Sequence, residues 1–167
     1  MTEIKEMTYE DLINMFDSFK TGFIVIGGSW CRNFNDVMDN LLKVSNEEGL
    51  DTIYKYDPLF ENIYGEKEDL RDCKSLEVKL KYYAIVEKMG FKNEEKVKDT
   101  LIARMPVPCF ASLKHGICDN YYAVELFKDN NILHLKDDNT DKTIDFENNI
   151  RNLVKEVNND ILLCNYR

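Results

Sequence analysis

One cysteine of this chain stands where a reactive thiol is expected. Cys31 lies between the continuous apolar run of residues 23–26 and a segment with apolar side chains at helical spacing. These side chains are Phe34, Val37, Met38, Leu41 and Leu42. The pattern predicts a strand, a short loop and a helix that begins near the cysteine. Backbone N–H groups and the dipole at a helix N-terminus favour a thiolate over a thiol, so we expect Cys31 to be a nucleophile.

A partner thiol next to Cys31 is missing. Three positions after it stands Phe34, so the chain has no C-x-x-C motif at this place. In thiol–disulfide exchange a thiolate attacks a disulfide sulfur, and a second thiol must then attack the mixed disulfide to release the product. A single cysteine here predicts that this second thiol comes from elsewhere in the chain or from another molecule.

Other types of reactive or binding site lack a complete motif. His115 and His134 are far apart in the sequence and neither adjoins a cysteine pair, so we expect no metal site. We interpret His115 as a solvent-facing turn residue, and Cys118 and Cys164 as structural cysteines. Residues 27–30 match neither the G-x-S-x-G elbow of hydrolases nor the spacing of a dinucleotide-binding loop, and we expect no cofactor.

The elements around Cys31 form a predicted βαβ unit. A strand is expected over residues 23–26, a helix over about residues 33–49, and a further strand over residues 51–56. A connection of this kind places the two strands parallel, with a right-handed crossover. Strands that alternate with helices predict the α/β fold class.

The surroundings of Cys31 and a later segment resemble the thioredoxin superfamily. The family's active site is a strand followed by W-C-x-x-C and a helix, which Trp30 and Cys31 match in part. Val107 and Pro108, followed by a short strand and a K-x-G turn, resemble the family's cis-proline region. The resemblance implies a three-layer α/β/α sandwich with a mixed central sheet. It also implies that residues 1–167 form a single thioredoxin-like domain.

The resemblance also implies roles for individual residues. Cys31 is implied to be the nucleophile, and Trp30 to form an apolar wall that guides the docking of a peptide. The backbone of Val107, beside Pro108, is implied to pair with the bound substrate strand. We expect Arg32 to add positive potential that strengthens the thiolate.

Two departures from the family pattern affect the redox reaction. Phe34 replaces the second cysteine, and Val25 stands where many thioredoxins have a buried acid that accepts a proton. The dithiol mechanism is therefore not expected in its usual form. Cys109, which follows the expected cis-proline, is the candidate resolving thiol, although a cysteine in a strand also serves as a small hydrophobe. Cys73 is a second candidate if its segment folds over the site, and otherwise a small thiol such as glutathione would release the adduct.

Residues 58–105 are longer than the connection in a minimal thioredoxin. We expect them to form a helical insertion before the cis-proline strand, within the same domain. One helix is predicted to face the core with Leu76, Leu80 and Tyr83, and a second helix is predicted over residues 94–103. The insertion would either shape a groove for a substrate or partner, or extend the core.

Composition and charge narrow the function classes. The chain has 31 acidic and 22 basic residues, a net charge of −9 and no dense cluster of lysine and arginine, which argues against nucleic-acid binding. No apolar segment approaches the roughly 20 residues of a membrane span, and the N-terminus lacks the apolar core of a signal peptide. We therefore expect a cytoplasmic protein with no membrane partner, whose five cysteines stay reduced and form no disulfide framework.

Two functions are compatible with these features. The first is a cytoplasmic monothiol oxidoreductase of thioredoxin-like type, whose partners are disulfides of proteins or small thiols. The second is a redox-inactive binding or adaptor module that holds a peptide or protein partner. Cys31 beside Trp30, together with the Val107-Pro108 pair, favours the enzyme. The absence of a second cysteine and of a buried acid favours binding. We expect the enzyme, and we assign no oligomeric state.

Overall fold

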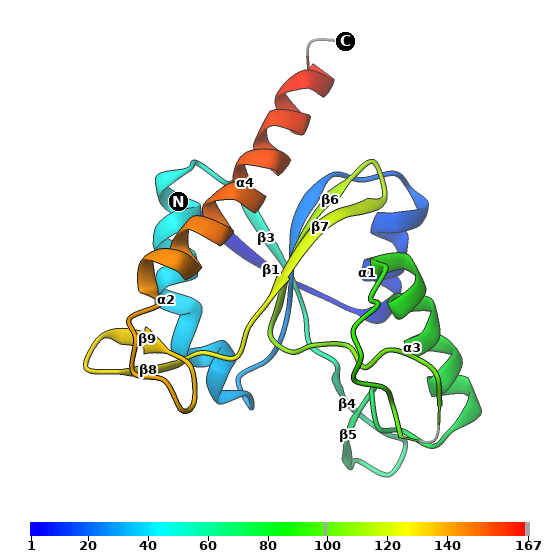
Figure 1. Cartoon of the computed structure of the whole chain (residues 1–167). Helices are drawn as coiled ribbons and strands as arrows, with labels where there is room; N and C mark the ends of the chain where they lie inside the picture. Colours follow the sequence, from blue (N-terminus) through cyan, green and yellow to red (C-terminus); the bar gives the residue numbers. More distant parts are fainter. Residues whose placement is uncertain (99, 166–167) are drawn as a thin grey trace.

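The centre of the structure is a mixed, five-stranded sheet. The computed structural model describes residues 1–98 and 100–165, with the backbone alone at residue 165. The strands of the sheet are β1 (Glu3–Met7), β2 (Gly22–Ile26), β3 (Thr52–Tyr56), β6 (Cys109–Lys114) and β7 (Ile117–Ala123), and their order is β1-β3-β2-β6-β7. Strands β1, β3 and β2 are parallel, whereas β6 is antiparallel to both β2 and β7. The α/β class and the mixed sheet expected from the sequence are confirmed (Figure 1).

Helices cover both faces of this sheet. They are α1 (Tyr9–Asp17), α2 (Arg32–Glu47), α3 (Leu76–Met89) and α4 (Thr143–Asn165). Helices α1 and α3 pack on one face, where they form the α1–α3 core, and α2 and α4 pack on the other, where they form the α2–α4 core (Figure 1). Among the described residues, no helix is both long enough and apolar enough to cross a membrane.

The strand β2 separates the two cores. All five of its residues are buried, as expected for a central strand with both faces covered. Ile24 and Ile26 belong to the α1–α3 core, whereas Phe23 and Val25 belong to the α2–α4 core. This alternation follows from the two-residue period of side chains along a strand. The apolar run found in the sequence therefore holds both helix layers on the sheet.

The helix α2 begins at the end of the loop that follows β2. Its buried residues lie on one side of the helix and pack onto the sheet. They include Phe34, Val37, Leu41 and Val44. Cys31 is the N-cap residue of α2, in an extended conformation with φ −99° and ψ 115°. The predicted strand, loop and helix around Cys31 are therefore confirmed.

Two small antiparallel hairpins flank the main sheet. One consists of β4 (Leu59–Glu61) and β5 (Lys67–Asp69), and it lies on the side of α1 and α3. The other consists of β8 (Phe127–Asp129) and β9 (Ile132–His134), and it lies on the side of α2 and α4 (Figure 1). The first hairpin belongs to the segment that the sequence predicted to be helical.

Most of residues 58–105 is not helical, which corrects the expectation of a helical insertion. Helix α3 forms, but the described part of the segment 94–103 is an irregular loop whose ends pair in antiparallel fashion. The side-chain amide of Asn93 donates hydrogen bonds to the carbonyl oxygens of Glu95 (3.2 Å) and Arg104 (2.8 Å). The N–H of Arg104 also donates to Glu95 (2.8 Å). These bonds between the two ends of the loop replace the local bonds of a helix.

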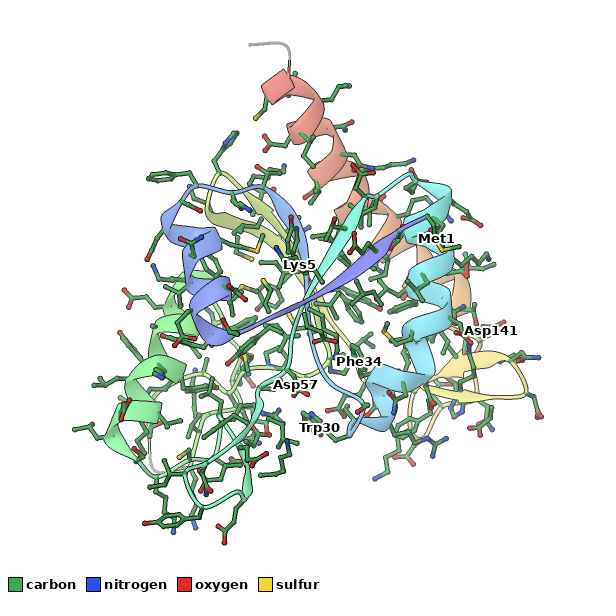
Figure 2. The ribbon with its side chains drawn as sticks, turned by 180° about the vertical axis from the view of Figure 1, so that it is seen from behind. Met1, Lys5, Trp30, Phe34, Asp57 and Asp141 are labelled. Atoms are coloured by element: carbon green, nitrogen blue, oxygen red, sulfur yellow. The ribbon has the colours of Figure 1, made fainter. Side chains whose placement is uncertain are left out.

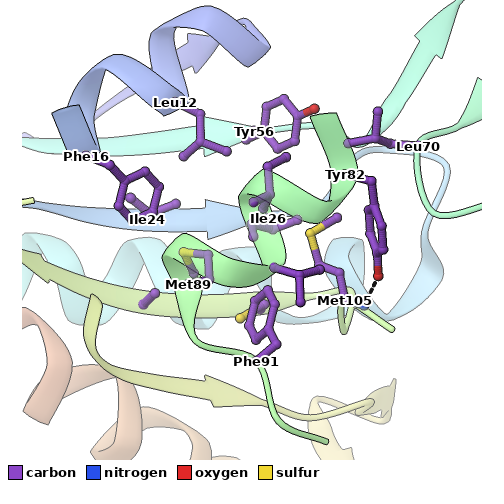
Figure 3. Packing of buried hydrophobic residues seen from close by; sticks show 14 of the residues in the cluster. Leu12, Phe16, Ile24, Ile26, Tyr56, Leu70, Tyr82, Met89, Phe91 and Met105 are labelled. Carbon is purple, nitrogen blue, oxygen red and sulfur yellow. Dashed lines mark hydrogen bonds between the residues drawn. The ribbon is translucent and has the colours of Figure 1, made fainter. Parts of the chain in front are cut away.

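The helix α3 turns a different side to the core from the one predicted. Leu76, Leu80 and Tyr83, which were expected to face inward, are exposed. The buried residues are Tyr82, Ile85, Val86 and Met89. The Tyr82 hydroxyl accepts a hydrogen bond from the N–H of Met105 (2.6 Å; Figure 3) and donates one to the carbonyl oxygen of Ala103 (2.8 Å), in the segment that follows α3. These buried hydrogen bonds of Tyr82, together with the apolar side formed by the four buried residues, decide which side of α3 packs on the core.

Candidate functional site

The residues singled out from the sequence lie at one edge of the sheet. Because β2 and β3 are parallel, the loops that follow them leave the sheet at the same edge. Strand β6 starts at this edge, since Cys109 lies opposite Ile26 in the antiparallel pair. Figure 2 shows Trp30, Phe34 and Asp57 grouped there. We call this edge, where β2 and β3 end and β6 begins, the thiol edge.

Cys31 caps α2 with its backbone and leaves its thiol free. Its carbonyl oxygen accepts a hydrogen bond from the N–H of Asn35 (3.1 Å), and its own N–H donates to the carbonyl oxygen of Gly28 (3.0 Å). The Cys31 side chain makes no capping hydrogen bond and is partly buried against both cores. Cys31 therefore stands at the N-terminus of α2, where the positive end of the helix dipole lies, and is partly accessible to solvent.

Trp30 is held in place by a hydrogen bond to Asp57. The indole Nε1–H donates to Asp57 Oδ1 over 2.8 Å, and the same oxygen accepts the N–H of Leu59 at 2.9 Å. The two side chains meet above Gly28, where a Cβ atom would overlap with both of them. Trp30 is nevertheless 40% exposed, so its ring forms part of the surface beside Cys31.

Arg71 reaches the site from the segment before α3. Its guanidinium lies 5.9 Å from the centre of the Trp30 ring and forms an ion pair of 2.8 Å with Asp69. It also donates a hydrogen bond to the carbonyl oxygen of Met105 (3.3 Å). Sequence reasoning missed Arg71, because its contacts depend on how this segment folds. Asp57 was also missed as a site residue, although its place directly after a predicted strand was a usable signal.

Arg32 contacts the β8–β9 hairpin. Its guanidinium pairs with Asp36 at 3.2 Å and with Asp129 at 3.7 Å, and it lies 4.9 Å from the centre of the Phe127 ring. Two carboxylates thus offset its charge, and these contacts give no support to the expected positive potential at Cys31. What the contacts do show is a connection between the start of α2 and the hairpin.

Buried apolar side chains stand at the two positions where the resemblance implies a second cysteine and an acid. Phe34 is buried, and its ring packs against Gly27, where a Cβ atom would overlap with the ring. Val25 is buried in the same α2–α4 core. The Nζ of Lys55 lies 5.5 Å from the centre of the Phe34 ring and forms an ion pair with Glu6 (2.9 Å). Neither a second thiol nor a buried acid stands at these two positions behind Cys31.

Val107 and Pro108 lead into β6 at the thiol edge. The peptide bond between them is cis, as expected from the sequence. Both side chains are buried, and Val107 belongs to the α1–α3 core, against which Cys31 also packs. The binding of a substrate strand by the backbone of Val107 stays a prediction.

The other cysteines differ in their surroundings. Cys109 is fully buried in the α1–α3 core, and burial raises the pKa of its thiol. Burial also raises the pKa of Cys118 to about 11. Cys73 is partly buried, with its Sγ 3.7 Å from the carboxylate of Glu68. These surroundings favour the interpretation of Cys109 as a small buried hydrophobe over that of a resolving thiol.

A partly apolar pocket adjoins the thiol edge. It has a volume of about 370 Å³, and its walls come from the ends of β1 and β3, from the start of α1 and from the segment that follows β3. Asp57 and Lys81 are the charged residues of its lining. Its apolar walls include Tyr56, Phe60, Leu70 and Val78. A pocket of this size and character suits an apolar side chain or a small ligand.

The sequence matches no protein-family model, and no curated protein is significantly similar to it. The function of Cys31 must therefore be inferred from the geometry of the thiol edge. That geometry combines a partly exposed thiol at a helix N-terminus, an anchored indole ring and a neighbouring apolar pocket.

Proposed function

We propose that this chain is a thioredoxin-like protein that exchanges disulfides through the single thiol of Cys31. The observation that carries the proposal is the position of Cys31 as the partly exposed N-cap of α2. Backbone N–H groups in the first turn of a helix and the helix dipole favour the anion that this reaction needs. The proposed substrates are disulfides of proteins or of small thiols, in a compartment such as the cytoplasm where thiols are kept reduced.

The topology supports the thioredoxin-like part of the proposal. The sheet order β1-β3-β2-β6-β7, with β6 antiparallel to both neighbours, agrees with the mixed sheet that the resemblance implies. Helices on both faces agree with the implied three layers. We include residues 1–167 in one proposed domain, in which residues 58–105 are an enlarged connection of mixed structure.

The proposed reaction is an exchange without net oxidation of the chain. The Cys31 thiolate attacks one sulfur of a disulfide, an S–S bond forms between them, and the other half leaves as a thiolate that takes up a proton. A second thiol, from a small molecule or a partner protein, loses its proton and attacks the mixed disulfide. That thiol forms a disulfide with the part of the substrate that was bonded to Cys31, and Cys31 is released as a thiolate.

The anchored indole and the pocket support the docking of a partner. The Trp30 ring, held by Asp57, offers a flat apolar surface next to the thiol. The neighbouring pocket would accept an apolar side chain that lies close to the partner's sulfur. We propose Trp30 and the backbone around Val107 and Pro108 as the contacts of the substrate.

A second function, binding without exchange, is favoured by one specific observation. Phe34 and Val25 are buried apolar residues at the positions where a dithiol enzyme has its second cysteine and its acid. As a binding module, the chain would hold a peptide at the thiol edge without forming a disulfide through Cys31. The exchange function predicts that Cys31 reacts with disulfides faster than its partial exposure to solvent would explain. The binding function predicts no such excess.

The deciding experiment compares Cys31 with Cys164 in their reaction with glutathione disulfide. Cys164 is exposed and Cys31 is partly buried, so exposure alone predicts that Cys164 reacts first. Under the exchange proposal Cys31 reacts first, because its position at the start of α2 stabilises the thiolate. The full chain is incubated in buffer with a metal chelator, and the adducts are located by peptide mass spectrometry. The Cys31→Ser variant serves as the control.

Either order of reaction decides between the two functions. A Cys31 adduct that forms first and disappears on addition of a free thiol supports exchange. An adduct at Cys164 while Cys31 stays unreacted would overturn the exchange proposal and leave the binding module.

A further inference from the structure

A second group of reactive side chains lies at the opposite end of the sheet from Cys31. His115 stands in the turn between β6 and β7, beyond the end of β6 that pairs with Gly22. Asp160 and Cys164 are about one turn apart on α4, and both contact His115. The sequence had indicated a solvent-facing histidine, a structural cysteine and no metal site.

The three side chains converge on one point. Asp160 Oδ1 lies 3.1 Å from His115 Nε2, and Cys164 Sγ lies 3.9 Å from the same nitrogen. One ligand atom from each residue lies within 4.8 Å of the other two. In a tetrahedral zinc site, bond lengths of about 2.0 to 2.3 Å place the ligand atoms roughly 3.3 to 3.8 Å apart. The two distances to Nε2 bracket that spacing, so small side-chain rotations would complete the geometry.

The arrangement differs from a catalytic triad of cysteine, histidine and aspartate. In a triad the acid binds one ring nitrogen of the histidine and the nucleophile faces the other. Here Asp160 and Cys164 both face Nε2 of His115. A cation can occupy the point that the three groups share, whereas a proton relay through the ring needs both nitrogens.

The loop before β2 holds two of the three ligands in place. The Thr21 hydroxyl donates a hydrogen bond to Asp160 Oδ2 (2.5 Å), which leaves Oδ1 directed at His115. The N–H of His115 donates to the Thr21 hydroxyl oxygen (3.2 Å), and the N–H of Gly116 donates to the carbonyl oxygen of Lys20 (2.9 Å). The Asp160 side chain is 14% exposed. Outer hydrogen bonds of this kind orient the ligands of metal sites before the ion arrives.

We propose that His115, Asp160 and Cys164 bind a zinc ion. Imidazole nitrogen, carboxylate oxygen and thiolate sulfur are the ligand types that zinc takes in proteins. The carboxylate and the thiolate together offset the charge of the ion. On binding, the Cys164 thiol releases its proton to the solvent, and the His115 ring keeps its proton on Nδ1 so that Nε2 coordinates the metal.

The set of ligands selects zinc over the hard cations. Calcium and magnesium take oxygen ligands, whereas this site offers one carboxylate with one nitrogen and one sulfur. Thiolate and imidazole together suit zinc. Three protein ligands in a tetrahedral site leave a fourth position for water or an external ligand. The ion would also join the β6–β7 turn to the last turns of α4.

Titration of the full chain with zinc tests the proposal. The protein is kept reduced by a reductant without thiols, and zinc is added in competition with a chromophoric chelator. We expect one tightly bound zinc ion per chain. Cobalt, used as a spectroscopic substitute, should give the charge-transfer absorption of a cobalt–thiolate bond, and Cys164→Ser should abolish that absorption.

Variants of single residues assign the ligands. Cys164→Ser and His115→Asn should each abolish stoichiometric binding, and asparagine tolerates the left-handed backbone at position 115 (φ 50°), so the turn is kept. Asp160→Asn keeps an acceptor for the Thr21 hydroxyl but loses the charge, and it should weaken binding. Thr21→Val removes the outer hydrogen bond and should weaken binding roughly 10- to 100-fold. Cys73→Ser, the matched control, should bind zinc like the unchanged chain.

Alkylation gives a second readout that does not depend on the competing chelator. Zinc should slow the alkylation of Cys164 and leave that of Cys73 unchanged. No binding above background, or binding that survives both Cys164→Ser and His115→Asn in folded protein, would overturn the proposal. Circular dichroism shows whether each variant is folded. The outcome is independent of what Cys31 does, because that residue lies at the other end of the sheet.

Discussion

The indole nitrogen of Trp30 donates a hydrogen bond to Asp57 Oδ1, 2.8 Å away, above the backbone of Gly28. This contact joins the loop after β2 to the residue after β3, so two neighbouring parallel strands supply one wall of the site. It fixes the Trp30 ring beside Cys31 while part of the ring stays exposed. A wall that is already in position reduces the entropy lost when a partner docks.

Removal of the Asp57 carboxylate should release the Trp30 ring. Asp57→Ala takes away the acceptor of the indole N–H and of the Leu59 N–H, so the free energy of unfolding should fall by about 1 kcal/mol. Trp30 is the one tryptophan of the chain, and its fluorescence emission should shift to longer wavelength. Urea unfolding followed by circular dichroism measures the stability. Asp57→Asn keeps an acceptor and should resemble the unchanged chain; an equal loss in both variants would contradict the role of the hydrogen bond.

A cysteine at position 34 tests the reason for single-thiol exchange. Phe34→Cys restores the C-x-x-C spacing, and the new thiol should attack a mixed disulfide on Cys31. The glutathione adduct of Cys31 should then be transient, whereas it should persist in Phe34→Ser, as followed by intact mass. Both variants leave a cavity next to Gly27 and should lower the free energy of unfolding by roughly 3 to 5 kcal/mol. Equal persistence of the adduct in both would show that a thiol at this position does not resolve it.

Alkylation of Cys118 should require alkaline solution. Burial raises the pKa of its thiol to about 11, so the protonated and unreactive form predominates at neutral pH. Its alkylation rate should rise about tenfold for each pH unit until the pKa is approached. Cys109, whose pKa is also raised by burial, should stay unlabelled until the chain unfolds. Peptide mass spectrometry over a pH series measures both, and fast labelling of either cysteine at neutral pH would contradict this prediction.

The hydrogen bond between His134 and Asp129 should contribute stability at low pH and lose that contribution as the pH rises. His134 Nε2 lies 2.6 Å from Asp129 Oδ2, and this hydrogen bond raises the pKa of His134 above its ordinary value of 6.5. Because the folded state holds the proton more tightly, the stabilisation is full below about pH 6.5 and is lost as the pH rises through the folded-state pKa. In an NMR titration, Asp129→Asn should return the pKa of His134 towards 6.5, and Asp137→Asn should leave it unchanged. An unaltered pKa in Asp129→Asn would contradict this cause.

Loss of one buried hydroxyl should weaken the packing of α3. Tyr82→Phe leaves the N–H of Met105 without its hydrogen bond, which should lower the free energy of unfolding by about 1 to 3 kcal/mol. Tyr83→Phe, the matched change at the exposed neighbouring position, should have almost no effect. Urea unfolding of both variants measures the difference. Equal stabilities would show that this hydrogen bond does not anchor α3.

Local patterns were sufficient to place Cys31. The apolar run of residues 23–26 becomes a strand covered on both faces, and the helical spacing that follows becomes α2. Both signals depend on residues a few positions apart, and the N-cap position of Cys31 follows from where one pattern ends and the next begins. The Val107-Pro108 segment before β6 was located in the same way, by its resemblance to a short motif.

The segment between β3 and β6 was predicted less well, because its local patterns allow more than one arrangement. Helix α3 has apolar residues on two sides, and the sequence did not show which side would be buried. The choice depends on a hydrogen bond between Tyr82 and Met105, which are separated by 23 positions. The described part of the segment 94–103 likewise depends on hydrogen bonds between its two ends, which compete with the local hydrogen bonds of a helix.

The sequence alone placed Cys31 at a helix start and located the strands β2, β3 and β6 of the sheet, since these features depend on nearby residues. Tertiary structure alone decided which distant residues meet. Arg71 lies beside Trp30, and His115 meets Asp160 and Cys164, because the packing of separate elements brings them together. The spacing of residues along the chain does not show these contacts, because His115 is more than 40 positions away from Asp160 and Cys164. The pairing of β6 in the sheet and the docking of α4 on it create the proposed zinc site.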